Sequence, residues 1–148
     1  QNVDGLHQAA GSRRVLELHG SIWRLRCTQC SYRREDRRVP LPELPPHCPE
    51  CRNLLRPDVV WFGESLPRDT VDAAWSAAAT CSTMLVVGTS AVVEPAASLP
   101  RIAHRNGTRV IEFNPERTPV SRYADKAVRK PAGEALPRWW AVRSGGRT

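Results

Sequence analysis

Four of the five cysteines form two closely spaced pairs, each with two residues between its members. The pairs are Cys27 with Cys30 and Cys48 with Cys51, and seventeen residues separate them. A Cys-x2-Cys turn directs two thiolates toward one point, and a connection of this length lets two such turns meet around a tetrahedral ion. We predict one structural zinc ion, favoured over rubredoxin-type iron, with no coordination position left for water.

His47 lies beside Cys48 and is the alternative ligand, although four cysteines already suffice. The fifth cysteine, Cys81, falls in a predicted helix and is expected to be a small core residue. An odd number of cysteines, four of them in tight pairs, favours metal ligation over disulfides in an intracellular chain.

His19 is the second residue that could do chemistry. It ends a strand-like run at residues 15–18 and precedes a glycine, a place where a strand delivers its last side chain to a crevice. A lone histidine is also a common structural residue. Asn2 and Asp4, in a loop-like opening, either line the same crevice or serve as turn residues. The residues alone leave both interpretations open.

The 148 residues, 41% of them hydrophobic, are enough to bury one ordinary core carrying a small module. No apolar run approaches the length that spans a bilayer, and residues 1–20 lack the pattern of a secretory signal. We expect a soluble, cytoplasmic protein with no membrane segment.

Two segments of different character must position these side chains. Residues 21–58 are rich in Arg, Pro and Cys, and five prolines between residues 40 and 49 are too dense for a helix or a central strand. This segment is predicted to be an irregular, metal-stapled insert. Residues 1–20 and 59–142 are expected to form the larger fold, and residues 143–148 a disordered tail.

The larger fold alternates apolar runs with segments of helical periodicity. Strands are predicted at residues 59–64, 84–87 and 109–113, and helices at residues 69–82 and 98–105. Such an order predicts a parallel α/β sheet with right-handed crossovers, and the run at 84–87 is typical of a strand buried on both faces.

Small and polar residues follow two of these strands. Gly88, Thr89 and Ser90 come after the second strand, and Asn114 comes after the third. Ligands of parallel α/β sheets bind beyond the carboxyl ends of the strands, so these four residues are expected to line one crevice. The glycine, with its neighbouring hydroxyls and N–H groups, could cradle a nucleotide there.

The order of these motifs is informative as a set. It comprises Gln1-Asn2-Val3-Asp4, Leu6-His7, Ala10-Gly11, His19-Gly20, the two cysteine pairs, Pro57, Val59-Val60, Phe62-Gly63-Glu64, Gly88-Thr89-Ser90 and Asn114. This set resembles the sirtuins, NAD-dependent protein-lysine deacylases, to about residue 140. Residues 62–67 and 94–97 are more similar to the bacterial and desuccinylase-like branch. The resemblance implies a Rossmann-like NAD-binding core with an inserted four-cysteine zinc module.

The resemblance also implies roles. In this family the acyl-lysine oxygen attacks the ribose C1′ of NAD and nicotinamide leaves. His19 would then act as general base on a ribose hydroxyl, which attacks the resulting imidate. Asn2 and Asp4 would hold the nicotinamide end and complete the catalytic set. The implied NAD contacts are Gln1, Asn2, Asp4, Gly88, Thr89, Ser90 and Asn114, and those to the acylated-lysine protein substrate are Val60, Phe62, Gly63, Glu64, Val92 and Val93.

One departure from the family pattern concerns the beginning of the chain. Sirtuins open with a Gly-Ala-Gly-x-Ser segment and an Arg-containing loop, and neither occurs here. We therefore expect an N-terminally truncated chain whose incomplete core binds NAD poorly and exposes apolar sheet surface. A thermal-shift titration with NAD would test this, since a large stabilisation at micromolar NAD would contradict it.

The net charge of +7, from 22 basic and 15 acidic residues, suggests a rival function. A zinc-ribbon module could bind nucleic acid through Arg24, Arg26, Arg33, Arg34, Arg37 and Arg38. Glu35 and Asp36 interrupt this cluster, and no aromatic stacking motif accompanies it. We therefore favour protein substrates over nucleic acid. A third alternative is an inactive sirtuin fragment.

Overall fold

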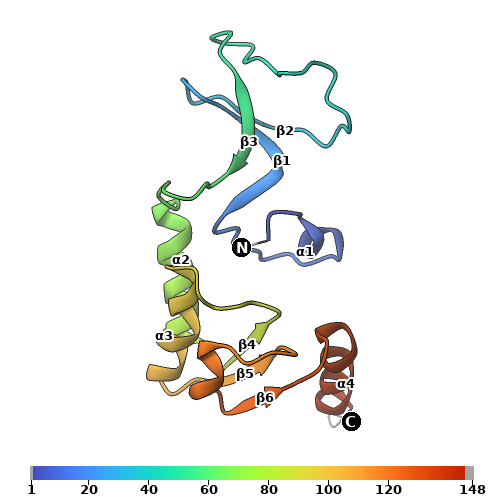
Figure 1. Ribbon diagram of the computed structural model, residues 1–148, viewed down its shortest axis with the longest axis vertical. Coiled ribbons are helices and arrows are strands. Elements are labelled where there is room, and N and C mark those ends of the chain that lie inside the picture. The colour runs from blue at the N-terminus through green and yellow to red at the C-terminus, as the bar shows by residue number, and fades with distance from the viewer. Residues whose placement is uncertain (1, 146–148) are drawn as a thin grey trace. The chain divides into compact units, whose positions relative to one another are not determined.

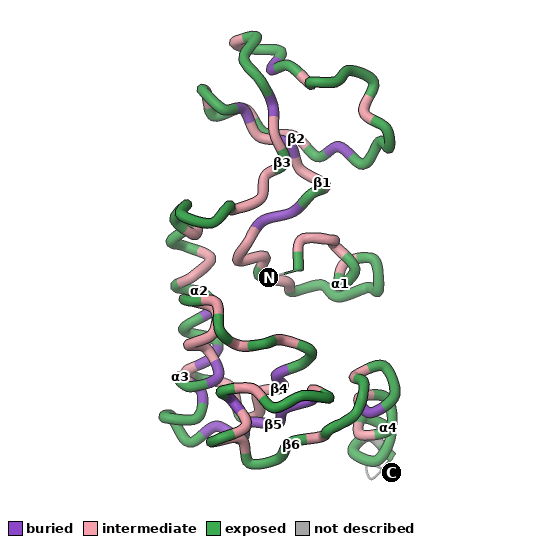
Figure 2. Tube along the Cα trace, in the orientation of Figure 1, coloured by how far each residue is buried: buried purple, intermediate pink, exposed green. Residues whose placement is uncertain are grey.

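The computed structural model describes residues 2–145, which belong to two compact units, Gln1–Val71 and Asp72–Thr148 (Figure 1). Each unit has its own core, and the buried residues lie on the strands and on the helices and loops that pack against them (Figure 2). Among residues 2–145 there is no helix with the length and apolar character needed to cross a bilayer.

The first unit contains a short helix and a three-stranded antiparallel sheet. The elements are α1 (Leu6–Ala9), β1 (Gly20–Cys27), β2 (Arg33–Glu35) and β3 (Leu55–Val59). The strand order is β2-β1-β3, with Leu25 of β1 opposite Pro57. The buried cluster of this unit consists of Leu25, Cys27, Cys48 and Leu55, so its core lies where the cysteines are.

The insert is more regular than predicted for residues 21–58, because the prolines are confined to places that tolerate them. The dense prolines lie in the loop between β2 and β3. Pro57 lies within β3, which is an edge strand and does not need every N–H for pairing. The central strand β1 contains no proline and pairs on both sides.

The strand predicted at residues 15–18 is wrong. These residues enter a turn, in which the Leu18 N–H donates to the Leu16 carbonyl at 3.1 Å and the Gly20 N–H to the Glu17 carbonyl at 3.1 Å. The Glu17 carboxylate accepts hydrogen bonds from Gln8 at 2.7 Å and Arg24 at 2.6 Å. These bonds hold the chain in a turn, and His19 therefore precedes a strand instead of ending one.

The second unit is a parallel α/β layer. It comprises most of α2 (Arg68–Thr80), then β4 (Thr83–Val87), η1 (Ala96–Ser98), α3 (Leu99–Arg105), β5 (Arg109–Phe113), η2 (Pro119–Arg122), β6 (Lys126–Val128) and α4 (Ala132–Ser144). The strand order is β4-β5-β6, and both pairings are parallel. The predicted fold class, a parallel α/β core with a four-cysteine module, is confirmed.

Helices cover both faces of the central strand β5. Val110 is completely buried with Ala103 of α3 on one face. Ile111 and Phe113 point to the other face and pack against α4, where the rings of Phe113 and Trp139 lie edge to face at 5.8 Å. This alternation follows from the two-residue period of a strand and makes β5 the most buried element.

Two strand predictions need correction. The apolar run 59–64 does not join the parallel sheet, because β3 ends at Val59 and the Glu64 N–H closes a turn onto the Trp61 carbonyl at 3.0 Å. The short strand β6 takes the third place in the sheet. β4 is not buried on both faces either, since Val86 is its one buried residue and Val87 is 38% exposed.

The last helix, α4, was not predicted from the sequence. α4 continues through Ser144, and Arg143 lies 5.0 Å from the Trp139 ring one turn earlier. The predicted tail is therefore wrong at its first two residues, while residues 146–148 lie outside the described part. An apolar groove of about 440 Å³ lies next to α4 and is lined by Leu85, Ala132, Gly133, Leu136, Pro137 and Trp140.

Candidate functional site

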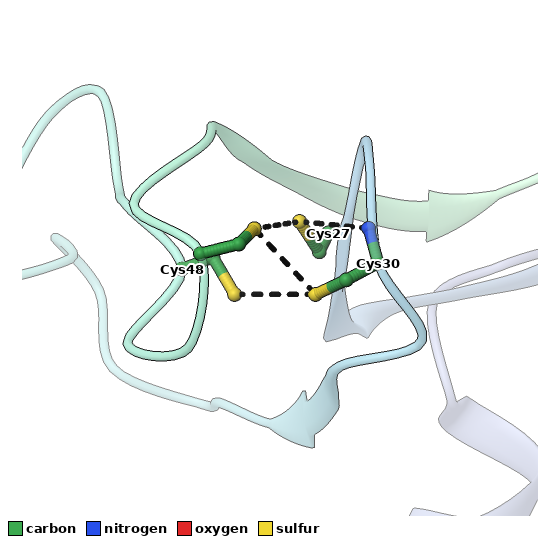
Figure 3. Close-up of side chains that lie close together, drawn as sticks. Cys27, Cys30 and Cys48 are labelled. Atoms are coloured by element: carbon green, nitrogen blue, oxygen red, sulfur yellow. Dashed lines mark hydrogen bonds between the residues drawn. The ribbon is translucent and has the colours of Figure 1, made fainter.

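The four paired cysteines converge in the first unit. Cys27 ends β1 and Cys30 follows in the next turn, whereas Cys48 and Cys51 lie in the loop before β3 (Figure 3). Backbone hydrogen bonds shape both turns: the Cys30 N–H donates to the Cys27 Sγ atom at 3.4 Å, and the Arg52 N–H donates to the Cys48 carbonyl at 3.0 Å. The predicted meeting of the two pairs is confirmed.

The distances between the sulfur atoms fit a tetrahedral ion. All four Sγ atoms lie within 4.8 Å of one another, with 3.4 Å between Cys27 and Cys51 and 3.6 Å between Cys30 and Cys48. Zinc–sulfur bonds of about 2.3 Å place the sulfurs of a tetrahedron about 3.8 Å apart, whereas a disulfide requires about 2.05 Å. The four cysteines are therefore positioned for one structural zinc ion.

The local environment prepares one of the thiols for ligation. The side chain and backbone of Asn53 donate hydrogen bonds to Cys51 and help to lower the pKa of its thiol to about 6. A thiol with this pKa is largely a thiolate at neutral pH, which is the form that binds metal. His47 does not belong to this cluster, and its Nδ1 atom lies 2.7 Å from Glu43.

His19 lies in the turn before β1 and is half-buried. Its Nδ1 atom is buried and has no hydrogen-bond partner among residues 2–145. Burial lowers the pKa of the imidazole below its usual value of 6.5, so the ring is neutral at neutral pH. A neutral imidazole has one ring nitrogen that can accept a proton.

Gly20 fixes the backbone next to this histidine. Its φ is +79°, and a Cβ atom added there would lie 1.9 Å from the Asp58 carbonyl oxygen. We expect Gly20→Ala to destabilise the first unit by more than 4 kcal/mol, because the clash with the backbone adds to the left-handed strain. Gly11→Ala is the matched control, since Gly11 has a φ of +88° with open space around it and should lose about 1 kcal/mol.

Thermal or denaturant unfolding of the metal-loaded protein measures both effects. Equal losses in the two variants would show that the close approach of β3 to Gly20 is absent in solution.

The segment that contains Asn2 and Asp4 is tied to β1. The Val3 carbonyl accepts from the Ile22 N–H at 3.0 Å, and the Asp4 carbonyl accepts from the Trp23 indole at 2.5 Å. The Asp4 side chain accepts from the Leu6 N–H at 3.0 Å, as expected of a turn residue. Asn2 is exposed. Gln1 was assigned to the nucleotide site by the sequence and lies outside the described residues.

The predicted crevice residues of the second unit come together. The Gly88 N–H donates to the Phe113 carbonyl at 3.0 Å, and the Asn114 amide donates to the Thr89 carbonyl at 2.9 Å. The Thr89 hydroxyl accepts from the Ala91 N–H at 3.1 Å, and Ser90 is exposed. The carboxyl ends of β4 and β5 thus carry one hydrogen-bonded group of loops, as expected for a parallel sheet.

Residues 60–64 form a braced turn and not the strand that was predicted. The Val60 N–H donates to the His19 carbonyl at 3.0 Å. Glu64 accepts from Arg56 at 2.5 Å and from the Trp61 N–H at 3.0 Å. Phe62, at the tip, is 95% exposed. In the second unit Val93 is half-buried and Val92 is 63% exposed.

Acidic residues neutralise most of the arginine cluster on which the nucleic-acid alternative depends. Arg24, Arg26 and Arg33 all pair with Asp58, at 3.4 to 3.7 Å. Arg34 and Arg38 pair with the buried Asp36, at 3.0 and 2.6 Å. Arginines engaged in this way are less available to phosphates, so the geometry does not favour this alternative.

The sequence analysis missed two groups beside the predicted residues. One is the Arg56–Glu64 pair that braces the turn at residues 61–64. The other is a buried carboxylate, Glu112, paired with Arg129 at 2.7 Å. A single acidic residue inside an otherwise apolar strand was the available signal for Glu112.

Comparisons with known proteins agree with this geometry. Residues 1–95 match the Sir2 family, and this region includes His19 and the four cysteines. An NAD-dependent protein deacylase of Aquifex aeolicus is 52% identical over 138 residues, with 93% of this chain and 58% of the relative covered. NAD-dependent protein deacylase 2 of Pyrobaculum aerophilum is 55% identical over 139 residues, with 93% and 55% covered.

Solved structures of Sir2 proteins are also similar to this chain. A Sir2 homolog–NAD complex has a TM-score of 0.93 and 46% identity, with 98% of this chain and 57% of that chain covered. A complex of Sir2 with a p53 peptide and NAD⁺ has a TM-score of 0.87 and 35% identity, with 100% and 62% covered. The chain therefore spans less than two thirds of the length of these relatives.

Proposed function

The chain belongs to the Sir2 family, and from this premise we propose that it provides the catalytic histidine, the zinc module and part of the NAD site of a protein-lysine deacylase. The match over residues 1–95 carries the proposal, because it includes Asn2, Asp4, His19 and all four cysteines. The cofactors are NAD and one structural zinc ion, and the partners are proteins with acylated lysines. Metal-ligating thiols favour the cytoplasm as its compartment.

Two groups of side chains support the proposed NAD site. His19 has a buried Nδ1 atom without a protein partner, which suits a hydrogen-bonding ligand group. The loops after β4 and β5 offer the Thr89 hydroxyl and the Asn114 amide at the ends of parallel strands. We assign His19, Asn2 and Asp4 to the nicotinamide-ribose end, and Gly88, Thr89, Ser90 and Asn114 to the adenosine half.

His19 has the properties of a general base. NAD, when bound, supplies the ADP-ribose that accepts the acyl group and the nicotinamide that leaves. The neutral imidazole takes a proton from a ribose hydroxyl. The hydrogen bond from the Val60 N–H to the His19 carbonyl fixes the backbone that carries the ring. The zinc ion, enclosed by four sulfurs, has no part in this proton transfer.

The exposed turn at residues 60–64 is the proposed contact for the substrate peptide. The Arg56 guanidinium lies 3.8 Å from the centre of the Trp61 ring, so this contact and the Glu64 hydrogen bonds brace the turn. Phe62 is left free to contact a partner. Val92 and Val93 are proposed to contact the same peptide.

A peptide assay tests the proposed function. Incubation with an acetyl-lysine peptide and NAD should release one nicotinamide for each acetyl group removed, measured by mass spectrometry and liquid chromatography. Omission of NAD is the control and should abolish both products. Acetyl removal that continues without NAD would contradict the proposal.

The pH dependence of this reaction follows from the environment of His19. Because burial lowers the pKa of His19, the midpoint at which the base loses its proton lies below pH 6.5. We expect kcat/KM to rise with pH through a midpoint below 6.5 and to be flat at neutral pH, measured with saturating NAD and the same peptide. A midpoint above 7 would mean that another group is the base.

A further inference from the structure

Glu112 is a carboxylate in the interior of the second unit. It lies in the central strand β5 between Ile111 and Phe113, and its side chain is 1% exposed. Three polar groups surround it, namely the hydroxyls of Thr118 and Ser121 and the guanidinium of Arg129. Burial alone raises the pKa of Glu112, but these hydrogen bonds and the nearby positive charge outweigh it and lower the pKa. Glu112 is therefore ionised at neutral pH.

The two hydroxyls connect this carboxylate to the chain that follows β5. The Thr118 hydroxyl donates to Glu112 and accepts from the Val120 N–H at 3.1 Å. The Ser121 hydroxyl donates to Glu112 at 2.7 Å and accepts from the Thr118 N–H at 2.9 Å. This reciprocal pair caps η2 and fixes the end of the loop at residues 114–118.

Arg129 connects the same carboxylate to the beginning of that loop. Its Nη2 atom lies 2.7 Å from a Glu112 oxygen, and its Nη1 atom donates to the carbonyls of Asn114 at 3.1 Å and Glu116 at 2.9 Å. A planar guanidinium can make these bonds at the same time, whereas a lysine ammonium cannot reproduce the fork. The loop is therefore held at both ends by one buried charge.

We propose that Glu112 and Arg129 are positioning residues, which hold the 114–118 loop so that Asn114 can bind the adenosine half of the nucleotide. Asn114 connects to the other strand end, since its amide donates to the Thr89 carbonyl at 2.9 Å. The inference rests on the proposed NAD site and adds residues that do not themselves touch the nucleotide. Its physical basis is preorganisation, because a loop already ordered loses less entropy on binding.

Arg129→Lys is the decisive variant, because it keeps the positive charge and loses the fork. Arg109→Lys is the matched control, because Arg109 is exposed at the amino end of β5, the strand that contains Glu112. NMR titration with ADP-ribose measures the dissociation constant up to millimolar values, and amide hydrogen exchange measures the order of residues 114–118 and of β5. For Arg129→Lys we expect about tenfold weaker ADP-ribose binding and faster exchange at Glu116, with β5 protected as in the wild type.

A second pair of variants separates hydrogen bonding from packing. Thr118→Val removes the hydroxyl that donates to Glu112, so it should loosen the 114–118 loop and weaken ADP-ribose binding. Thr118→Ser keeps the hydroxyl and should therefore keep the wild-type loop order and ADP-ribose affinity.

Three outcomes would overturn the inference. ADP-ribose binding by Arg129→Lys equal to that by Arg109→Lys would show that the fork does not position the site. Loss of β5 protection together with loop protection would show a merely structural role. Absence of ADP-ribose binding to the wild type would refute the proposed function as well, whereas the first two outcomes leave the proposed function intact.

Discussion

Replacing Cys48 with serine should remove the metal and unfold the first unit. Cys48 is 1% exposed and lies 3.6 Å, sulfur to sulfur, from Cys30. Structural zinc contributes on the order of 10 kcal/mol to the folding of small modules, and three thiolates cannot close the tetrahedron. We expect the zinc content to fall from one ion per chain to nearly none, measured by mass spectrometry of the metal. The β-sheet signal should be lost with it.

The loss of the metal should have this large effect because the first unit buries few other apolar side chains. Two members of its buried cluster, Cys27 and Cys48, belong to the four cysteines positioned for zinc, and Leu25 and Leu55 are the others. Burial of a leucine contributes at most about 3 kcal/mol, whereas ordering each residue costs about 1.5 kcal/mol. The two leucines cannot order β1, β2, β3 and the long proline-rich loop.

Cys81→Ser is the control for the cysteine chemistry. Cys81 lies in the second unit, where its thiol donates to the Ala78 carbonyl at 3.4 Å, and it belongs to no metal cluster among the described residues. The zinc content of this variant should stay at one ion per chain. A Cys48→Ser protein that keeps its metal and its sheet would disprove the assignment of Cys48 as a ligand.

The parts of the fold and site that were predicted correctly have their signal within a short stretch of sequence. The metal centre was found because each cysteine pair carries its geometry within four residues. β5 was predicted with its observed bounds, because an apolar run bounded by Asn106-Gly107 and Asn114-Pro115 leaves little choice. β6 was missed because its three residues, Lys126–Val128, show no apolar pattern. α4 was missed because Pro137 lies inside it and is usually a helix breaker.

The remaining errors come from contacts between residues distant in sequence. The apolar run 59–64 is typical of a strand, but Arg56 and Glu64 hold its second half in a turn. In the same way, Glu112 finds its partner Arg129 seventeen residues later, across a strand that the sequence does not reveal. Residue types predict which groups need partners, and the fold determines which partners they obtain.

His19→Asn should strongly reduce turnover and leave the metal in place. The substitution keeps a polar side chain of similar reach but removes the group that takes a proton at neutral pH. General base catalysis contributes about 10²- to 10⁴-fold to a rate, so we expect kcat to fall by that factor in the peptide assay. The zinc content should stay at one ion per chain, because His19 belongs to no metal cluster among residues 2–145.

The control for His19 is His104→Asn, an exposed histidine of α3 whose ring lies 5.2 Å from that of Tyr123. This variant should deacylate at the wild-type rate. Binding of ADP-ribose separates the remaining explanations for an inactive His19→Asn protein. Unchanged affinity with lost turnover places the defect in proton transfer, whereas lost affinity would mean that His19 holds the ribose and another residue is the base. The buried, unpartnered Nδ1 atom and the lowered pKa of His19 favour the first result.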